Sequence, residues 1–122
     1  AHRMAPLIVI APDVGEDAAG RPEYREHIEV VLYDQGLNVW HHTYHEGKPA
    51  WRKLAYSRFE IEPDARVVME VALRQTPKGM MLIVKAAGQE MGILSDALPT
   101  EYQFGLTGCE GVNRFYDVSL EW

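Results

Sequence analysis

The chain has 122 residues, 47% of them hydrophobic and 25% charged, with a formal net charge of −6 and one cysteine. This length allows one core, so we expect a single domain over residues 1–122, of which residues 1–4 could be a cloning remnant. The negative charge disfavours nucleic acid, no apolar run approaches the roughly 20 residues that span a bilayer, and a lone cysteine excludes an internal disulfide. We expect a soluble protein, cytoplasmic or secreted, with no membrane partner.

Apolar residues alternate with polar ones along most of the chain, which is typical of β-strands with one buried face. Turn residues interrupt this pattern at short intervals, and the one helical candidate is a single turn within residues 13–20. The predicted strands cover residues 6–11, 24–34, 37–45, 57–62, 65–74, 79–86, 101–108 and 113–122. Eight short antiparallel strands usually pack as two sheets face to face. We therefore predict an all-β fold, an antiparallel two-sheet β-sandwich of the jelly-roll type.

The alternation also predicts which side chains face the core. One face of each strand is apolar, and these side chains are expected to be mostly buried. They are Ile28, Val30, Leu32, Leu37, Val39, Phe59, Ile61, Val67, Met69, Val71, Leu82, Val84, Phe104, Leu106, Val118 and Leu120.

The strands over residues 24–34 and 37–45 are predicted to form a tight hairpin, joined by Gln35 and Gly36. Because neighbouring strands of a hairpin share their faces, the outward side chains of both strands form one surface. We take this surface as the candidate ligand-binding site. Its residues are Arg25, His27, Glu29, Tyr33, Asn38, Trp40, His42 and Tyr44.

The chemistry of this surface favours a sugar ligand. The C–H faces of a pyranose stack on aromatic rings such as Trp40 and Tyr44, while sugar hydroxyls need donors and acceptors such as His42 and Asn38. The alternative is that the two aromatic side chains only cover the sheet beneath the stretch 46–51, with Trp51 as a packing partner. Their grouping on one hairpin favours binding.

Three histidines, His41, His42 and His45, raise the question of a zinc site. On a strand His41 and His45 lie about 13 Å apart at 3.3 Å per residue, and His42 faces the opposite side, so the three cannot converge on one ion. We therefore predict no metal site and no cofactor, apart from an ion that takes a ligand from another strand. Glu29 with His27 could alternatively transfer protons, although residues two apart on a strand are commonly a plain surface pair.

The stretches FEIEPDARVVMEVAL, MLIVKAAGQEMG and LPTEYQFGLTGCEGVNRFYDVSLEW follow one another in residues 59–122. In this order they resemble the concanavalin A-like lectin/glucanase superfamily, which includes laminin G-like and polysaccharide-processing domains. The matching positions are Gly88 in a turn, Tyr102, Gly105 and Leu106 in the penultimate strand, and Phe115, Tyr116 and Asp117 in the last strand. The resemblance covers roughly residues 24–122 and implies a jelly-roll sandwich with a glycan-related role.

The glucanases of this superfamily carry paired carboxylates on one strand face, and the present sequence departs from that pattern. Alternation places Glu26 and Glu29 on opposite faces, so the pair cannot adopt the separation of about 5–5.5 Å that retaining hydrolysis needs. We therefore expect a non-catalytic, lectin-like domain that binds an oligo- or polysaccharide. A glycan-active enzyme using Glu29, His27 and His42 is the alternative, and an interaction domain whose aromatic face forms a homodimer contact is the third.

Overall fold

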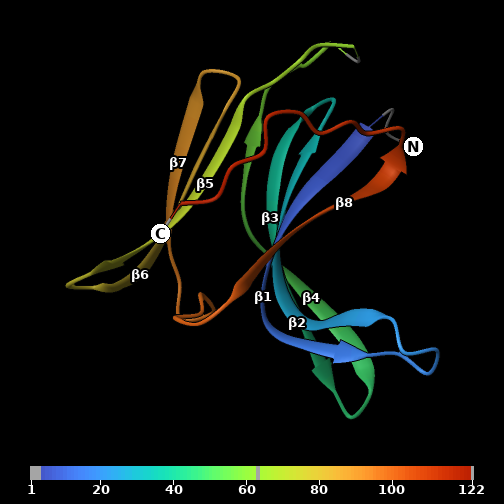
Figure 1. Cartoon of the computed structure of the whole chain (residues 1–122). Coiled ribbons are helices and arrows are strands. Elements are labelled where there is room, and N and C mark those ends of the chain that lie inside the picture. Colours follow the sequence, from blue (N-terminus) through green and yellow to red (C-terminus); the bar gives the residue numbers. More distant parts are fainter. Residues whose placement is uncertain (1–3, 63, 122) are drawn as a thin grey trace.

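The computed structural model describes residues 4–62 and 64–121, and within them it contains eight strands and no helix. The strands are β1 (Met4–Glu16), β2 (Pro22–Tyr33), β3 (Gly36–His45), β4 (Lys48–Arg58), β5 (Met69–Thr76), β6 (Gly79–Ala86), β7 (Gln89–Leu94) and β8 (Gln103–Gly111). They form two antiparallel sheets, a five-stranded sheet in the order β4-β3-β2-β1-β8 and a three-stranded sheet in the order β5-β6-β7 (Figure 1). The predicted all-β, two-sheet sandwich is confirmed. Among the described residues no helix could span a membrane.

Two-residue turns set the register of the hairpins. Glu46 and Gly47 both have positive φ angles, 52° and 76°, and so do Ala87 and Gly88, at 50° and 76°. Such pairs form the turns whose twist matches that of a β-hairpin. The turn predicted at Gly88 is confirmed. The β2–β3 turn lies one residue earlier than predicted, because Gly36 already pairs with Tyr33, but the two strands are neighbours as expected.

Three predicted elements are wrong. The strand predicted at 57–62 ends at Arg58 and is the last part of β4, which begins at Lys48. The strand predicted at 113–122 has no regular structure over residues 112–121. The helical turn predicted within 13–20 is absent because β1 continues to Glu16. The turn that follows β1 is held by the Asp17 carboxylate, whose Oδ1 accepts hydrogen bonds of 2.9 Å from the backbone N–H groups of Ala19 and Arg21.

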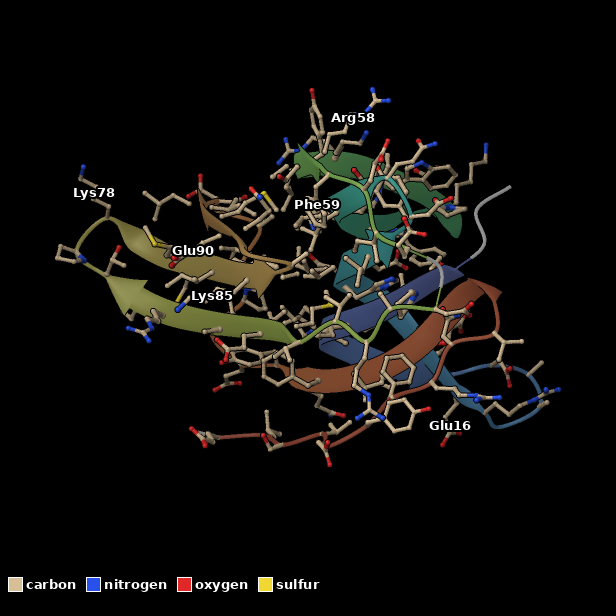
Figure 2. The ribbon with its side chains drawn as sticks, turned by 90° about the horizontal axis from the view of Figure 1, so that it is seen from above. Glu16, Arg58, Phe59, Lys78, Lys85 and Glu90 are labelled. Carbon is tan, nitrogen blue, oxygen red and sulfur yellow. The ribbon has the colours of Figure 1, made fainter. Side chains whose placement is uncertain are left out.

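The core lies between the two sheets and defines their faces. The five-stranded sheet contributes Ile10, Ile28, Val30, Leu32, Leu37 and Val39, and the three-stranded sheet contributes Leu82, Val84, Ala86 and Ile93. We call the face of the five-stranded sheet that carries the first set the inner face, and the opposite one the outer face. Phe59 follows β4 and packs between the sheets (Figure 2).

Most of the predicted core is confirmed. Ile28, Val30, Leu32, Leu37, Val39, Ile61, Leu82 and Val84 are buried, and Phe59, Val67, Met69, Val71 and Phe104 are partly buried against them. The prediction is wrong for Leu106, Val118 and Leu120, which are 42%, 64% and 54% exposed. Leu106 lies on β8, an edge strand, and the other two lie in the irregular C-terminal segment. That segment runs from the end of β8 back toward the three-stranded sheet (Figure 1).

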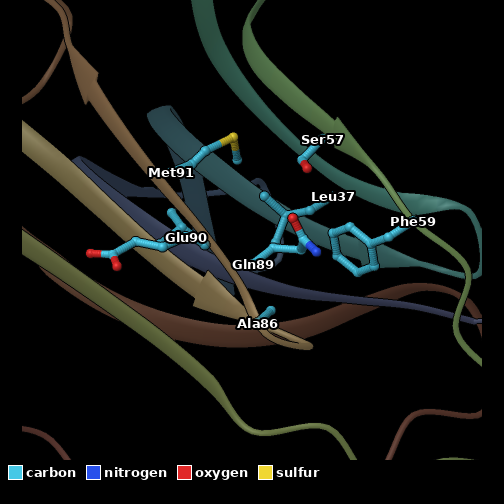
Figure 3. A pocket seen from close by; sticks show the side chains of 8 residues that line it. Leu37, Ser57, Phe59, Ala86, Gln89, Glu90 and Met91 are labelled. Atoms are coloured by element: carbon cyan, nitrogen blue, oxygen red, sulfur yellow. The ribbon is translucent and has the colours of Figure 1, made fainter.

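A narrow gap remains between the sheets at the β4–β7 side. Leu37 and Phe59 border it from the five-stranded side, and Gln89 and Met91 of β7 border it from the other (Figure 3). Its volume of about 10 Å³ is that of a single water at most. The gap is therefore a packing feature between the sheets and has no room for a ligand.

Candidate binding site on the outer face

The register of β2, β3 and β4 gathers polar and aromatic side chains on the outer face. β2 and β3 pair His27 with His42 and Glu29 with Trp40. β4 then places further side chains beside them: Trp51 opposite His42, Lys53 opposite Trp40 and Tyr56 opposite Asn38. A bulge after Val39 inserts Leu54 into β4 as an extra residue, and Leu54 packs against the core. The bulge thereby keeps Lys53 and Tyr56 on the same face.

Three of these side chains form one hydrogen-bonded cluster. The Nε2 atom of His27 lies 2.9 Å from Oε1 of Glu29, and the Nε2 atom of His42 lies 3.2 Å from Oε2 of the same carboxylate. The two imidazole rings are stacked, with 4.6 Å between their centroids and 11° between their planes. Each carboxylate oxygen of Glu29 therefore contacts one histidine, and both rings present the same nitrogen to it.

The cluster is set into an apolar part of the sheet. His27 is 8% exposed and is buried despite being polar. Val9 of β1 pairs directly with Glu29 and is 1% exposed. Because the neighbouring strand supplies apolar side chains, the carboxylate is partly removed from water, which strengthens its hydrogen bonds.

The surroundings shift two pKa values. Burial raises the pKa of the Glu29 carboxyl, but the hydrogen bond from His27 and the positive charges of protonated His42 and His27 outweigh burial, so that this pKa lies below its ordinary value. Burial lowers the pKa of His42, and the attraction of Glu29 does not cancel that effect. At neutral pH the cluster thus contains an ionised carboxylate and a neutral His42, whose Nε2–H donates to it.

Exposed aromatic rings flank the cluster. Trp51 is 61% exposed and stacks on His42, with 6.0 Å between centroids and 27° between planes. Tyr44 of β3 and Tyr56 of β4 are 45% and 65% exposed. Large apolar rings on a solvent-facing sheet are characteristic of binding surfaces.

Trp40 is less accessible than these rings. It is half-buried, and the ammonium group of Lys53 lies 5.0 Å from the centroid of its ring. The same ammonium lies 5.3 Å from the Tyr56 ring. Lys53 therefore occupies a ring face of Trp40 through a cation–π contact, and the accessible platform of this face is Trp51.

The remaining predicted site residues lie on either side of the cluster. The exposed Arg25 side chain lies over Gly15 of β1. Tyr33 is half-buried at the β2–β3 turn, four residues beyond Glu29 and about 13 Å along the strand. Asn38 pairs with Val31 near the same end, and its side-chain oxygen is buried without a hydrogen-bond partner among the described residues. The structure thus brings His27, Glu29, Trp40 and His42 together, while the Arg25 side chain lies over β1 and Tyr33 lies farther along β2.

The sequence analysis did not place Trp51, Lys53 and Tyr56 at the site. It took residues 46–51 as a loop, although Glu46 and Gly47 alone form the turn and β4 begins at Lys48. The signal was present, because a two-residue turn containing Gly after one strand predicts a hairpin partner. Trp51 and Lys53 also follow the period-two pattern of a strand.

The third strand divides its histidines between the two faces, as predicted. His42 lies on the outer face, whereas His41 pairs with Ile28 on the inner face and lies 3.2 Å from Oε1 of Glu26. The side chain of His45 lies outside the described part of the structure. Glu26 and Glu29 likewise lie on opposite faces, since each contacts a histidine of its own face.

A hollow of about 280 Å³ lies beside the β3–β4 hairpin. It is lined by His41, Thr43, Ala50, Trp51 and Arg52.

Comparison of the chain with protein-family models, with curated proteins and with solved structures gives no significant match.

Proposed function

We propose that the protein binds an oligo- or polysaccharide on the outer face of its five-stranded sheet, as a lectin-like domain without catalysis. The observation that carries this proposal is the exposed ring of Trp51 beside the hydrogen-bonded cluster of His27, Glu29 and His42. An aromatic platform next to fixed polar groups is the combination that sugars require. Their C–H faces stack on the ring, and their hydroxyls exchange hydrogen bonds with the polar groups.

The roles follow from the chemistry of each group. Trp51 and Tyr44 provide ring faces, of which Trp51 is the more exposed. Glu29 is an acceptor at neutral pH, and Lys53 supplies donors from β4. Three neighbouring strands hold these groups, so little conformational entropy is lost when a sugar binds.

A glycan array followed by calorimetry with the best-bound oligosaccharide tests the proposal. We expect Trp51→Ala to weaken binding at least tenfold, because it removes the platform. Tyr116→Ala is the matched control, since Tyr116 is 52% exposed in the C-terminal segment and lies outside the proposed site. Equal affinity of Trp51→Ala and the unchanged protein for every bound glycan would refute the proposal, as would the absence of binding to any glycan.

Catalysis on a glycan is the second candidate, and the Glu29 carboxylate between two imidazoles favours it. An ionised carboxylate can accept a proton, and a histidine can return it. Release of reducing ends or of an unsaturated product from the bound polysaccharide would establish this activity, provided that Glu29→Gln abolishes it.

A homodimer contact through the aromatic face is the remaining alternative, and sedimentation of the unchanged protein and of Trp51→Ala tests it. Dimers that dissociate in the variant would identify the aromatic face as a subunit contact.

A further inference from the structure

We propose that His27, Glu29 and His42 form a binding site for a divalent transition-metal ion of the zinc type. The three residues offer two imidazole nitrogens and one carboxylate oxygen, and these atoms all lie within 4.8 Å of one another. This inference does not depend on glycan binding, because neither the ion nor its test requires a sugar.

The spacing of the donor atoms is close to that of a shared ion. An ion about 2.1 Å from each of several ligands leaves neighbouring ligand atoms roughly 3.0–3.4 Å apart. His27 Nε2 lies 2.9 Å from Oε1 of Glu29 and His42 Nε2 lies 3.2 Å from Oε2, so each nitrogen is at this distance from a different oxygen of the same carboxylate. The three donor atoms lie within 4.8 Å of one another, and two ligands of one ion can be at most about 4.2 Å apart. The side chains must therefore turn slightly toward the ion, which would replace two hydrogen bonds without a change of backbone.

The fold accounts for this convergence. His27 and Glu29 are two residues apart on β2, which places their side chains on one face, and His42 lies directly opposite His27 on β3. His41 and His42 lie on opposite faces of one strand, so these two histidines do not share an ion. For His42, the ligands from another strand are His27 and Glu29 of β2.

The kind of ion follows from the ligand set. Two imidazoles with one carboxylate suit Zn²⁺ and Co²⁺, whereas Ca²⁺ and Mg²⁺ prefer oxygen ligands alone. Three protein ligands leave a position for water or another oxygen ligand, as in zinc sites that act on substrates. The burial of His27 and the stacking of His42 on Trp51 hold the rings in place, which reduces the ordering that binding requires.

Metal titration of the untagged full chain tests the site. Co²⁺ is added and followed by its visible absorption, and Zn²⁺ is then used to displace it. We expect one equivalent of Co²⁺, bound with micromolar or tighter affinity and displaced by Zn²⁺. His42→Ala and His27→Ala should each weaken binding at least 100-fold, and Glu29→Gln at least tenfold.

The matched control is His41→Ala, because His41 lies next in sequence and has its own glutamate, Glu26, on the inner face. It should bind Co²⁺ like the unchanged protein. Near-ultraviolet circular dichroism must show that each variant is folded, and His42→Gln replaces the alanine variant if that one is not. Binding weaker than millimolar would overturn the proposal, as would equal affinity in His41→Ala and His42→Ala. Retained glycan binding together with absent metal binding would overturn this inference alone.

Discussion

The imidazole rings of His27 and His42 lie face to face on adjacent strands, 4.6 Å apart at their centroids, because the β2–β3 register pairs the two residues directly. Glu29 reaches both rings from the same strand as His27. One turn of two residues thus fixes the geometry of the whole cluster. A register slip of one residue would send His42 to the core face and separate it from Glu29.

This cluster predicts a loss of stability at acid pH. The pKa of His42 is lower in the folded protein than in the unfolded chain. Between neutral pH and about pH 5 the unfolded chain therefore binds more protons, which favours unfolding. The pKa of Glu29 is also lowered, and below about pH 4.5 the unfolded chain protonates this group first. Both effects have the same sign. The free energy of unfolding should therefore fall as the pH decreases from 7 to 4, measured by urea denaturation without added metal.

Glu29→Gln isolates the contribution of the carboxylate. Gln carries no charge, and it replaces two hydrogen bonds to a charged acceptor by weaker ones, so the variant should lose about 1–2 kcal/mol at pH 7. Its unfolding free energy should depend less on pH between 5 and 3.5 than that of the unchanged protein. Identical slopes in the two proteins over this interval would show that Glu29 does not contribute.

A substitution in the core should also lower the free energy of unfolding, through the loss of buried apolar contacts. Leu82 on the central strand of the three-stranded sheet is fully buried between the sheets. Leu82→Ala should lower the free energy of unfolding by about 2–5 kcal/mol, because it removes buried methyl groups and leaves a cavity. Leu94→Ala on the neighbouring strand is the control, since Leu94 is 47% exposed and should lose less than about 1 kcal/mol. Equal losses would contradict the assigned core.

Gly36 is a backbone position at which a side chain would collide with a neighbouring strand. Its φ is 144°, and an added Cβ would overlap the carbonyl oxygen of Ser57 on β4. Gly36→Ala should therefore destabilise the protein by more than about 2 kcal/mol and shift the β3–β4 pairing. Gly47→Ala has the same kind of positive φ but no atom near the added carbon, so it should lose only about 1 kcal/mol. Thermal midpoints of both variants measure the difference.

The fold could be predicted from the sequence where local patterns decide it. Alternation in β2 and β3 identified Ile28, Val30 and Val39 as core residues and placed His27, Glu29 and His42 on the opposite face. The last predicted strand failed for a physical reason. Val118 and Leu120 alternate with polar residues, but a strand also needs a hydrogen-bonded neighbour, and the described chain supplies none there.

The faces of the candidate site residues could be predicted from the sequence, but their contacts could not. Alternation gives the face of a side chain, whereas only the register shows that His42 meets His27 and that Trp51 stacks on His42. The register depends on turn length and bulges, such as the extra Leu54 in β4. Consequently, the sequence argument gave Trp40 the role of platform, and the structure leaves Trp51 more exposed.

Replacing Asn38 should raise the free energy of unfolding but weaken glycan binding. Its side-chain oxygen is buried on the outer face without a hydrogen-bond partner among the described residues, which destabilises the folded protein. Val is β-branched and apolar, so Asn38→Val removes the unsatisfied oxygen and suits a central strand. We expect the variant to gain about 1 kcal/mol of unfolding free energy, measured by urea denaturation.

The same variant should bind glycan more weakly if Asn38 serves the proposed site. Because the Asn38 oxygen is buried, a ligand hydroxyl can donate to it only after a covering side chain moves aside. A valine side chain offers no acceptor even then, so calorimetry should show a loss of severalfold in affinity if the site uses this oxygen. Val31→Thr is the control, since Val31 pairs with Asn38 and the substitution keeps the β-branched shape. A variant that gains stability and keeps full affinity would show that the oxygen has no role in binding. A variant that loses stability would show that Asn38 is satisfied in the folded protein.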